Sequence, residues 1–213
     1  MQTCSRNCRP LGADVPWVMR VGLFGGTFDP PHVGHLVVAA SALSFAKLEK
    51  VIWIPAAEPP HRTKPIATSL QRFDMTRLSI ESNDRFEVSD IELRKDGKSY
   101  TIETLRIVHA TKPRDELFLI VGADNLRAFH TWRDPDGILG LAKLIVFGRD
   151  RDEYNEVDAD LLESAIIIPD TPLIGVSSSR IRKMITDGMP IRHLVPHGVA
   201  DYIRTNHLYR QDG

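Results

Sequence analysis

The chain has 213 residues, of which 42% are hydrophobic and 26% are charged, and these are ordinary proportions for a globular protein. Because 27 basic residues face 28 acidic ones, the net charge of −1 excludes the polybasic surface that general nucleic-acid or membrane-surface binding requires. No apolar run approaches the ~20 residues of a membrane span.

The N-terminal segment differs from the rest of the chain. Residues 1–18 lack apolar periodicity, and we expect them to form a disordered extension before a single domain over 19–213. Both cysteines, Cys4 and Cys8, lie in this segment. This excludes a disulfide framework for the domain and indicates a reducing, cytoplasmic environment.

Past residue 19, short apolar runs alternate with segments of helical periodicity. Strands that are apolar throughout and are separated by helices indicate βαβ units and a parallel sheet covered on both faces. We therefore predict a Rossmann-like, doubly wound α/β fold with closing C-terminal helices. The expected elements are, in chain order, strand 21–24, helix 34–48, strand 51–54, helix 70–82, strand 86–88, helix 100–110, strands 117–121, 144–147 and 166–168, and helices 178–186 and 198–206.

The residues that follow the first predicted strand can form a phosphate-binding loop. In parallel sheets, ligands bind beyond the carboxyl ends of the strands. Gly25 and Gly26 allow a tight turn and a close approach to a ligand. His32 and His35 are three residues apart, so both imidazoles can face one side of a helix start whose free amides favour an anion. The spacing matches neither the G-x-G-x-x-G fingerprint nor a Walker A loop.

A second candidate phosphate site lies at the start of the helix predicted over 178–186. Ser177 and Ser178 can cap this helix, its first amides point at an anion, and Arg182 follows about one turn later. Taken alone, the segment favours an ordinary serine cap followed by a solvated arginine. Its occurrence together with the first loop favours the phosphate site.

Several motifs in this order resemble a known family. The sequence His32-Val33-Gly34-His35 resembles the H-x-G-H signature of the nucleotidyltransferase superfamily. Over nearly all of residues 20–209, the chain resembles the nicotinate-nucleotide adenylyltransferases in particular. The stretches that carry this resemblance are Glu58-Pro59-Pro60-His61, Ser89-Asp90-Ile91-Glu92-Leu93, Ser99-Tyr100-Thr101, Gly122-Ala123-Asp124-Asn125-Leu126 with Phe129 and Trp132, Val176–Arg182, and Leu194-Val195-Pro196.

The resemblance implies a reaction and a set of site residues. Nicotinate mononucleotide would attack the α-phosphorus of ATP, giving nicotinate adenine dinucleotide and pyrophosphate for NAD synthesis, with Mg²⁺ bound through the ATP phosphates and no protein metal site. Such a reaction needs in-line positioning and charge stabilisation and no protein nucleophile. By the resemblance, His32, His35 and Arg182 are catalytic. The residues expected to bind ATP and its phosphates are Gly25, Gly26, Thr27, Phe28, Ser177 and Ser178.

The resemblance also implies a site for the nicotinate nucleotide. Trp132 would stack on the pyridine ring, and amides around Thr101 would receive the nicotinate carboxylate, with Asp124 and His61 nearby. Each residue also has a structural reading, since Trp132 can be a packing residue, Asp124 a helix cap and Thr101 a plain helix start. Arg62 stands where the family often has lysine, which leaves its contact with substrate undecided.

Other functions stay open at this stage. An enzyme that prefers nicotinamide mononucleotide, or accepts both substrates, is the nearest alternative, and a nucleotide-binding sensor without catalysis is a second. A dinucleotide-dependent oxidoreductase is disfavoured by the missing fingerprint glycines. We expect small-molecule partners only, neither nucleic acid nor membrane, and leave a homo-oligomer open.

Overall fold

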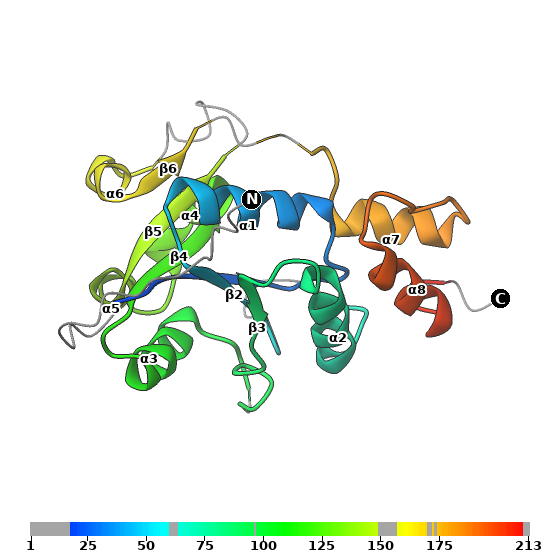
Figure 1. The fold of residues 1–213 in the computed structure, drawn as a ribbon, viewed down its shortest axis with the longest axis horizontal. Helices are drawn as coiled ribbons and strands as arrows, with labels where there is room; N and C mark the ends of the chain where they lie inside the picture. The colour runs from blue at the N-terminus through cyan, green and yellow to red at the C-terminus, as the bar shows by residue number, and fades with distance from the viewer. Residues whose placement is uncertain are drawn as a thin grey trace, which may run out of the picture.

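The strands of the described chain form one parallel sheet in the order β3-β2-β1-β4-β5-β6 (Figure 1). The computed structural model describes residues 18–59, 64–95, 97–148, 157–169, 172 and 174–210. Cys4, Cys8 and almost all of the predicted N-terminal extension lie outside these residues. The strands are β1 Arg20–Gly26, β2 Lys50–Pro55, β3 Phe86–Val88, β4 Glu116–Gly122, β5 Ala142–Phe147 and β6 Ile166–Ile168.

Every strand and helix predicted from the sequence is present, and the predicted α/β fold is confirmed. The structure adds four short elements that the sequence analysis missed, namely α4, η1, α5 and α6. The helices are α1 Val33–Phe45, α2 Ser69–Ile80, α3 Thr101–Thr111, α4 Ala123–Arg127, η1 Phe129–Thr131, α5 Pro135–Leu141, α6 Ala159–Ser164, α7 Ser178–Thr186 and α8 His197–Thr205.

The sheet is buried on both faces because neighbouring side chains of each strand point in opposite directions. In β4, Leu117 and Leu119 pack into a core with helix α3, whereas Phe118 and Ile120 pack into a second core with helix α1. This arrangement explains why β4 reads as a continuous apolar run rather than as an alternating one.

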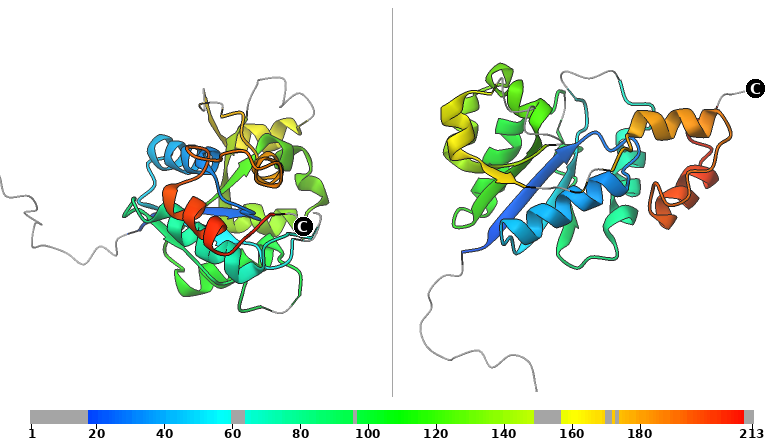
Figure 2. Two further views of the ribbon diagram at one scale, coloured as in Figure 1. Left: turned by 90° about the vertical axis from the view of Figure 1, so that its right-hand side faces the viewer. Right: turned by 90° about the horizontal axis from the view of Figure 1, so that it is seen from above.

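A third, smaller core joins α2 to the C-terminal helices. Met75 of α2, Ile181 of α7 and Val199 of α8 are fully buried in it. These helices lie beyond the end of β1 (Figure 2), so the C-terminal part of the chain closes over the carboxyl edge of the sheet.

The strand order reverses direction at β1. The chain leaves β1 for β2 on one side and later returns to pair β4 on the other side. A strand whose two neighbours are reached in opposite directions is a topological switch point, where ligands bind in α/β sheets. A ligand site is therefore expected at the loop after β1 and the turn after β4.

Candidate active site

The loop that follows β1 is shaped around the side chain of Phe28. This residue has a φ of 51°, and its buried ring lies over Gly26, where an added Cβ would come within 2.7 Å of the ring. The edge of the ring meets His35, with 5.1 Å between centroids. Gly25 is exposed and Thr27 half-buried. Phe28 therefore supports a histidine, in addition to the backbone contribution predicted for it.

The two histidines of the H-x-G-H motif form a stacked pair. The His32 and His35 rings lie 3.7 Å apart between centroids with 23° between their planes. The backbone N–H of His32 donates to Nδ1 of His35 at 3.1 Å. A Cβ at position 34 would lie 3.0 Å from Nδ1 of His32, which explains the glycine between them. The sequence prediction that both imidazoles face one side is confirmed.

Hydrogen bonding and burial set the protonation of this pair. Because Nδ1 of His35 accepts a hydrogen bond, its proton resides on Nε2, which is then a donor. His32 is buried, and its Nδ1 has no partner among the described residues. Loss of hydration lowers the pKa of His32 to about 4, so this imidazole is neutral at physiological pH.

The lowered pKa of His32 gives a pH dependence of stability. The unfolded chain takes up this proton near pH 6.5 and the folded chain near pH 4, so protonation favours the unfolded state between these values. We expect the free energy of unfolding to decline by about 3 kcal/mol from this residue as the pH falls through that window. Denaturant unfolding at several pH values measures the decline, and a His32→Gln variant should lack this component. Equal slopes for both chains would contradict the assignment.

The start of α7 lies against the loop after β1. Ser177 caps the helix by accepting from the amide of Arg180 at 3.2 Å, and Ser178 Oγ donates to the carbonyl of Pro30 at 2.9 Å. Arg182 donates through Nη1 to the carbonyl of Asp29 at 2.8 Å. The two candidate phosphate-binding segments, far apart in sequence, are therefore in contact in the structure.

Asp29 fastens this loop to two other parts of the chain, and the sequence analysis missed it. Its buried carboxylate accepts hydrogen bonds from the amides of Ile66 and Ala67 at 2.9 and 3.2 Å and from the Tyr209 hydroxyl at 2.7 Å. Burial, and next the charge of Asp29, raise the pKa of the Tyr209 phenol far above its usual value. The guanidinium of Arg182 lies 3.8 Å from the same carboxylate.

The candidate nicotinate residues lie around the start of α3. Thr101 is the first residue of this helix, and Trp132 is half-buried against the same core. Arg133, which follows Trp132, contacts residues on either side of Thr101. Its guanidinium lies 4.7 Å from the ring centroid of Tyr100 and pairs with the carboxylate of Glu103 at 2.8 Å. The structure thus brings Thr101 and Trp132 to one region.

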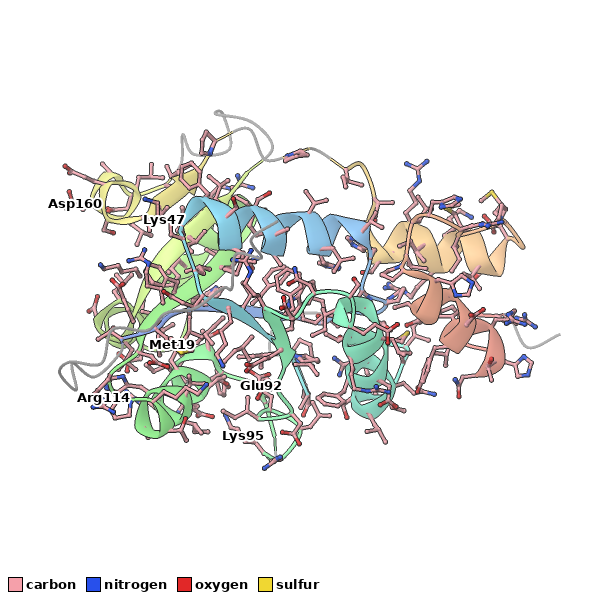
Figure 3. The ribbon with its side chains drawn as sticks, viewed as in Figure 1. Met19, Lys47, Glu92, Lys95, Arg114 and Asp160 are labelled. Atoms are coloured by element: carbon pink, nitrogen blue, oxygen red, sulfur yellow. The ribbon has the colours of Figure 1, made fainter. Side chains whose placement is uncertain are left out.

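The segment between β3 and α3 is fixed to the helix at two points (Figure 3). Thr104 donates to Oε1 of the buried Glu92 at 2.9 Å, and Lys95 pairs with Glu103 at 2.8 Å. The other carboxylate oxygen of Glu92 is buried with no partner among the described residues. These contacts hold the first turn of α3 in place.

Two further predicted residues have different outcomes. Asp124 lies in the first turn of α4, directly after β4, and is exposed, with its carboxylate folded back over Gly122. It is therefore inside the helix rather than its cap, at the carboxyl end of β4. His61, like Arg62, lies outside the described residues.

Comparison with known protein families identifies the family to which this sequence belongs. The cytidylyltransferase-like family matches residues 23–184, which include both histidines of the stacked pair and Arg182. The chain therefore belongs to this family of nucleotidyltransferases.

Full-length relatives narrow the assignment. A Desulfitobacterium hafniense protein named "Probable nicotinate-nucleotide adenylyltransferase" is 40% identical over 198 residues, covering 90% of this chain and 96% of its own. A Thermus thermophilus protein of the same name is 40% identical over 192 residues, covering 90% and 100%. The chain belongs to the nicotinate-nucleotide adenylyltransferases.

A solved structure shares the fold. The Plasmodium falciparum nicotinic acid mononucleotide adenylyltransferase, solved in complex with NaAD, superposes with a TM-score of 0.72 at 19% identity, covering 90% of this chain and 97% of its own.

None of the helices in the described segments has the length and apolar character needed to cross a membrane.

Proposed function

We propose that this chain joins nicotinate mononucleotide to the adenylyl group of ATP, giving nicotinate adenine dinucleotide and pyrophosphate. A 5′-phosphate oxygen of the mononucleotide forms a bond to the α-phosphorus, and the bond to the β-phosphate breaks. Family membership supports the reaction. The single observation that carries the site is the stacked His32–His35 pair beside Arg182, because it gathers donors for a phosphate at the switch point of the sheet.

The proposed roles follow from the donors that each residue offers. The Nε2–H of His35 would donate to the phosphate oxygens on which charge accumulates in the transition state, and His32 would contribute a neutral donor next to it. Arg182 would supply positive charge, and the first amides of α7 would face a phosphate. The attacking phosphate is already an anion, so the protein needs to position it rather than to deprotonate it.

Mg²⁺ is proposed to enter with ATP, bound through phosphate oxygens, which are the ligands it prefers. The buried carboxylate of Asp29 already accepts three hydrogen bonds, so we do not propose it as a ligand of Mg²⁺. When bound, Mg²⁺ would neutralise charge on the departing pyrophosphate.

Selectivity for nicotinate is proposed to reside at the start of α3. The amide of Thr101 has no acceptor among the described residues, so it can donate to the nicotinate carboxylate. A carboxamide would place its NH₂ against such a donor and leave both unpaired. Trp132 would stack on the pyridine ring, Asp124 would lie near the bound nucleotides, and His61 would approach from the loop after β2.

We further propose that residues 19–213 act as one nucleotidyltransferase domain in the cytoplasm. Its partners would be ATP and nicotinate mononucleotide. Its two phosphate-binding segments pack on each other through Ser178 and Arg182, which supports a single site within one domain.

Pyrophosphate release is the direct test of the function. With ATP and Mg²⁺, we expect nicotinate mononucleotide to support at least ~10-fold higher kcat/KM than nicotinamide mononucleotide. The loss of one well-placed hydrogen bond to the substrate lowers kcat/KM by about this factor. Equal turnover would refute the role of the Thr101 amide. If both mononucleotides bind without pyrophosphate release, the chain is a sensor and not an enzyme.

A further inference from the structure

Arg72 is a buried arginine that touches three segments of the chain at once. It projects from α2, its exposed fraction is 1%, and every hydrogen bond of its guanidinium goes to a main-chain carbonyl of a described residue. Nη1 donates to the carbonyls of Thr27, at 2.8 Å, and of Ala56. Nη2 donates to Ala57 at 2.9 Å, and Nε donates to Ala67 at 3.3 Å.

These partners make Arg72 a connector rather than half of an ion pair. No carboxylate of the described chain lies within salt-bridge distance of it. Burial lowers the pKa of Arg72, and the charge of Asp29 opposes this shift. A planar guanidinium with donors in a fixed fork can hold several carbonyls in one arrangement, which the single ammonium of lysine cannot do. The carbonyls belong to the loop after β1 and the loop after β2, so Arg72 fixes the distance between them.

The connection continues from the loop after β2 to the start of α3. The amide of Ala57 donates to Oγ of Ser99 at 3.0 Å, and the amide of Ser99 donates to the carbonyl of Glu58 at 3.0 Å. Ser99 lies two residues before Thr101. A continuous series of short contacts therefore runs from Thr27, at the ATP side, through Arg72 and Ser99 to the proposed nicotinate pocket.

We propose that Arg72 is a positioning residue that sets the spacing between the two substrate subsites, and so controls the in-line approach of the mononucleotide phosphate to the α-phosphorus of ATP. This inference rests on the proposed function of the two subsites. Arg72 itself is too deeply buried to touch either substrate. Its removal should leave each subsite able to bind its own ligand while the two bound ligands are misaligned.

Arg72→Lys tests this prediction through a split between kcat and KM. Because a misplacement of about 1 Å can cost as much as 10²-fold in rate, we expect kcat to fall by ~10- to 100-fold. Both KM values, and the Kd of each substrate measured alone by calorimetry, should stay within about threefold. Arg77→Lys is the matched control, because Arg77 is exposed on the same helix, and it should retain wild-type kcat.

Ser99→Ala provides a second variant in case Arg72→Lys does not fold. It removes the acceptor for the Ala57 amide at the far end of the series, and kcat should fall by ~3- to 10-fold with the same unchanged KM values. A folded Arg72→Lys chain with wild-type kcat, or one whose loss lies in the binding of one substrate, would overturn the proposal. If Arg72→Lys does not fold, an unchanged kcat in Ser99→Ala would overturn it. A wild-type chain without turnover would overturn the proposed function as well, so the two failures are distinguishable.

Discussion

Replacing His35 by alanine is expected to lower kcat at least ~100-fold while the chain stays folded. The Nε2–H of His35 is held in place from two sides, since its Nδ1 accepts from the His32 amide and Phe28 meets its ring. A donor fixed before the reaction needs no reorganisation when charge develops on the phosphate, and removing such a donor costs about 3–4 kcal/mol of transition-state stabilisation. Steady-state pyrophosphate release measures the loss.

The fold should survive this change because His35 lies at the start of α1, outside the cores that hold the sheet and its helices together, and its amide-to-ring bond with His32 is a local one. Loss of that hydrogen bond costs about 1 kcal/mol. His197→Ala is the matched control, since the His197 side chain is 89% exposed on α8. It should leave kcat unchanged. A loss below ~10-fold in a folded His35→Ala chain would reject a transition-state role for His35.

Arg182→Met is expected to lower kcat/KM by about 100-fold. The variant keeps the length of the side chain and removes its charge and its hydrogen bond to the Asp29 carbonyl. A charged donor facing a phosphate in a partly buried site contributes about 2–3 kcal/mol, which corresponds to this factor. The Arg182 side chain is 25% exposed, so its charge is only partly screened by solvent. Initial rates at subsaturating ATP provide the measurement.

Two further variants make the Arg182 experiment specific. Lys183→Met removes a neighbouring charge that is 76% exposed and pairs with Asp187, and we expect it to be silent. Arg182→Lys should recover part of the activity, because it restores the charge without the fork of donors. If Lys183→Met is as damaging as Arg182→Met, the effect reflects the general charge of α7, and the assigned role of Arg182 is wrong.

The fold was predictable because its signals are local. Most strands contain a continuous apolar run, such as Leu117–Val121 in β4, and most of the long helices have a cap or periodicity within the segment itself. The short helix α5 was missed although Asp134 caps it by accepting from the amide of Gly137 at 3.1 Å, a start signal that the sequence does contain. Its seven residues are too few to show helical periodicity.

The candidate site was predictable only where residues close in sequence form it. The stacked pair is formed by His32 and His35, which are three residues apart, with Gly34 between them, and this spacing is visible in the sequence. Asp29 and Tyr209 act through a contact that spans 180 residues, and nothing local marks either residue as a partner of the other. Arg72 occupies a helix position where arginine is ordinarily solvated, so its burial could be recognised only in three dimensions.

The hydrogen bonds of Arg72 to the main chain leave the side chains of the two loops open to variation in protein engineering. Because Arg72 donates only to carbonyl oxygens, its bonds do not depend on the side chains at Thr27, Ala56 and Ala57. Libraries that vary these loop positions can therefore explore new substrate preferences while position 72 stays arginine. The same libraries built on a chain with another residue at 72 should yield few active members, because each new loop would then need its own anchor.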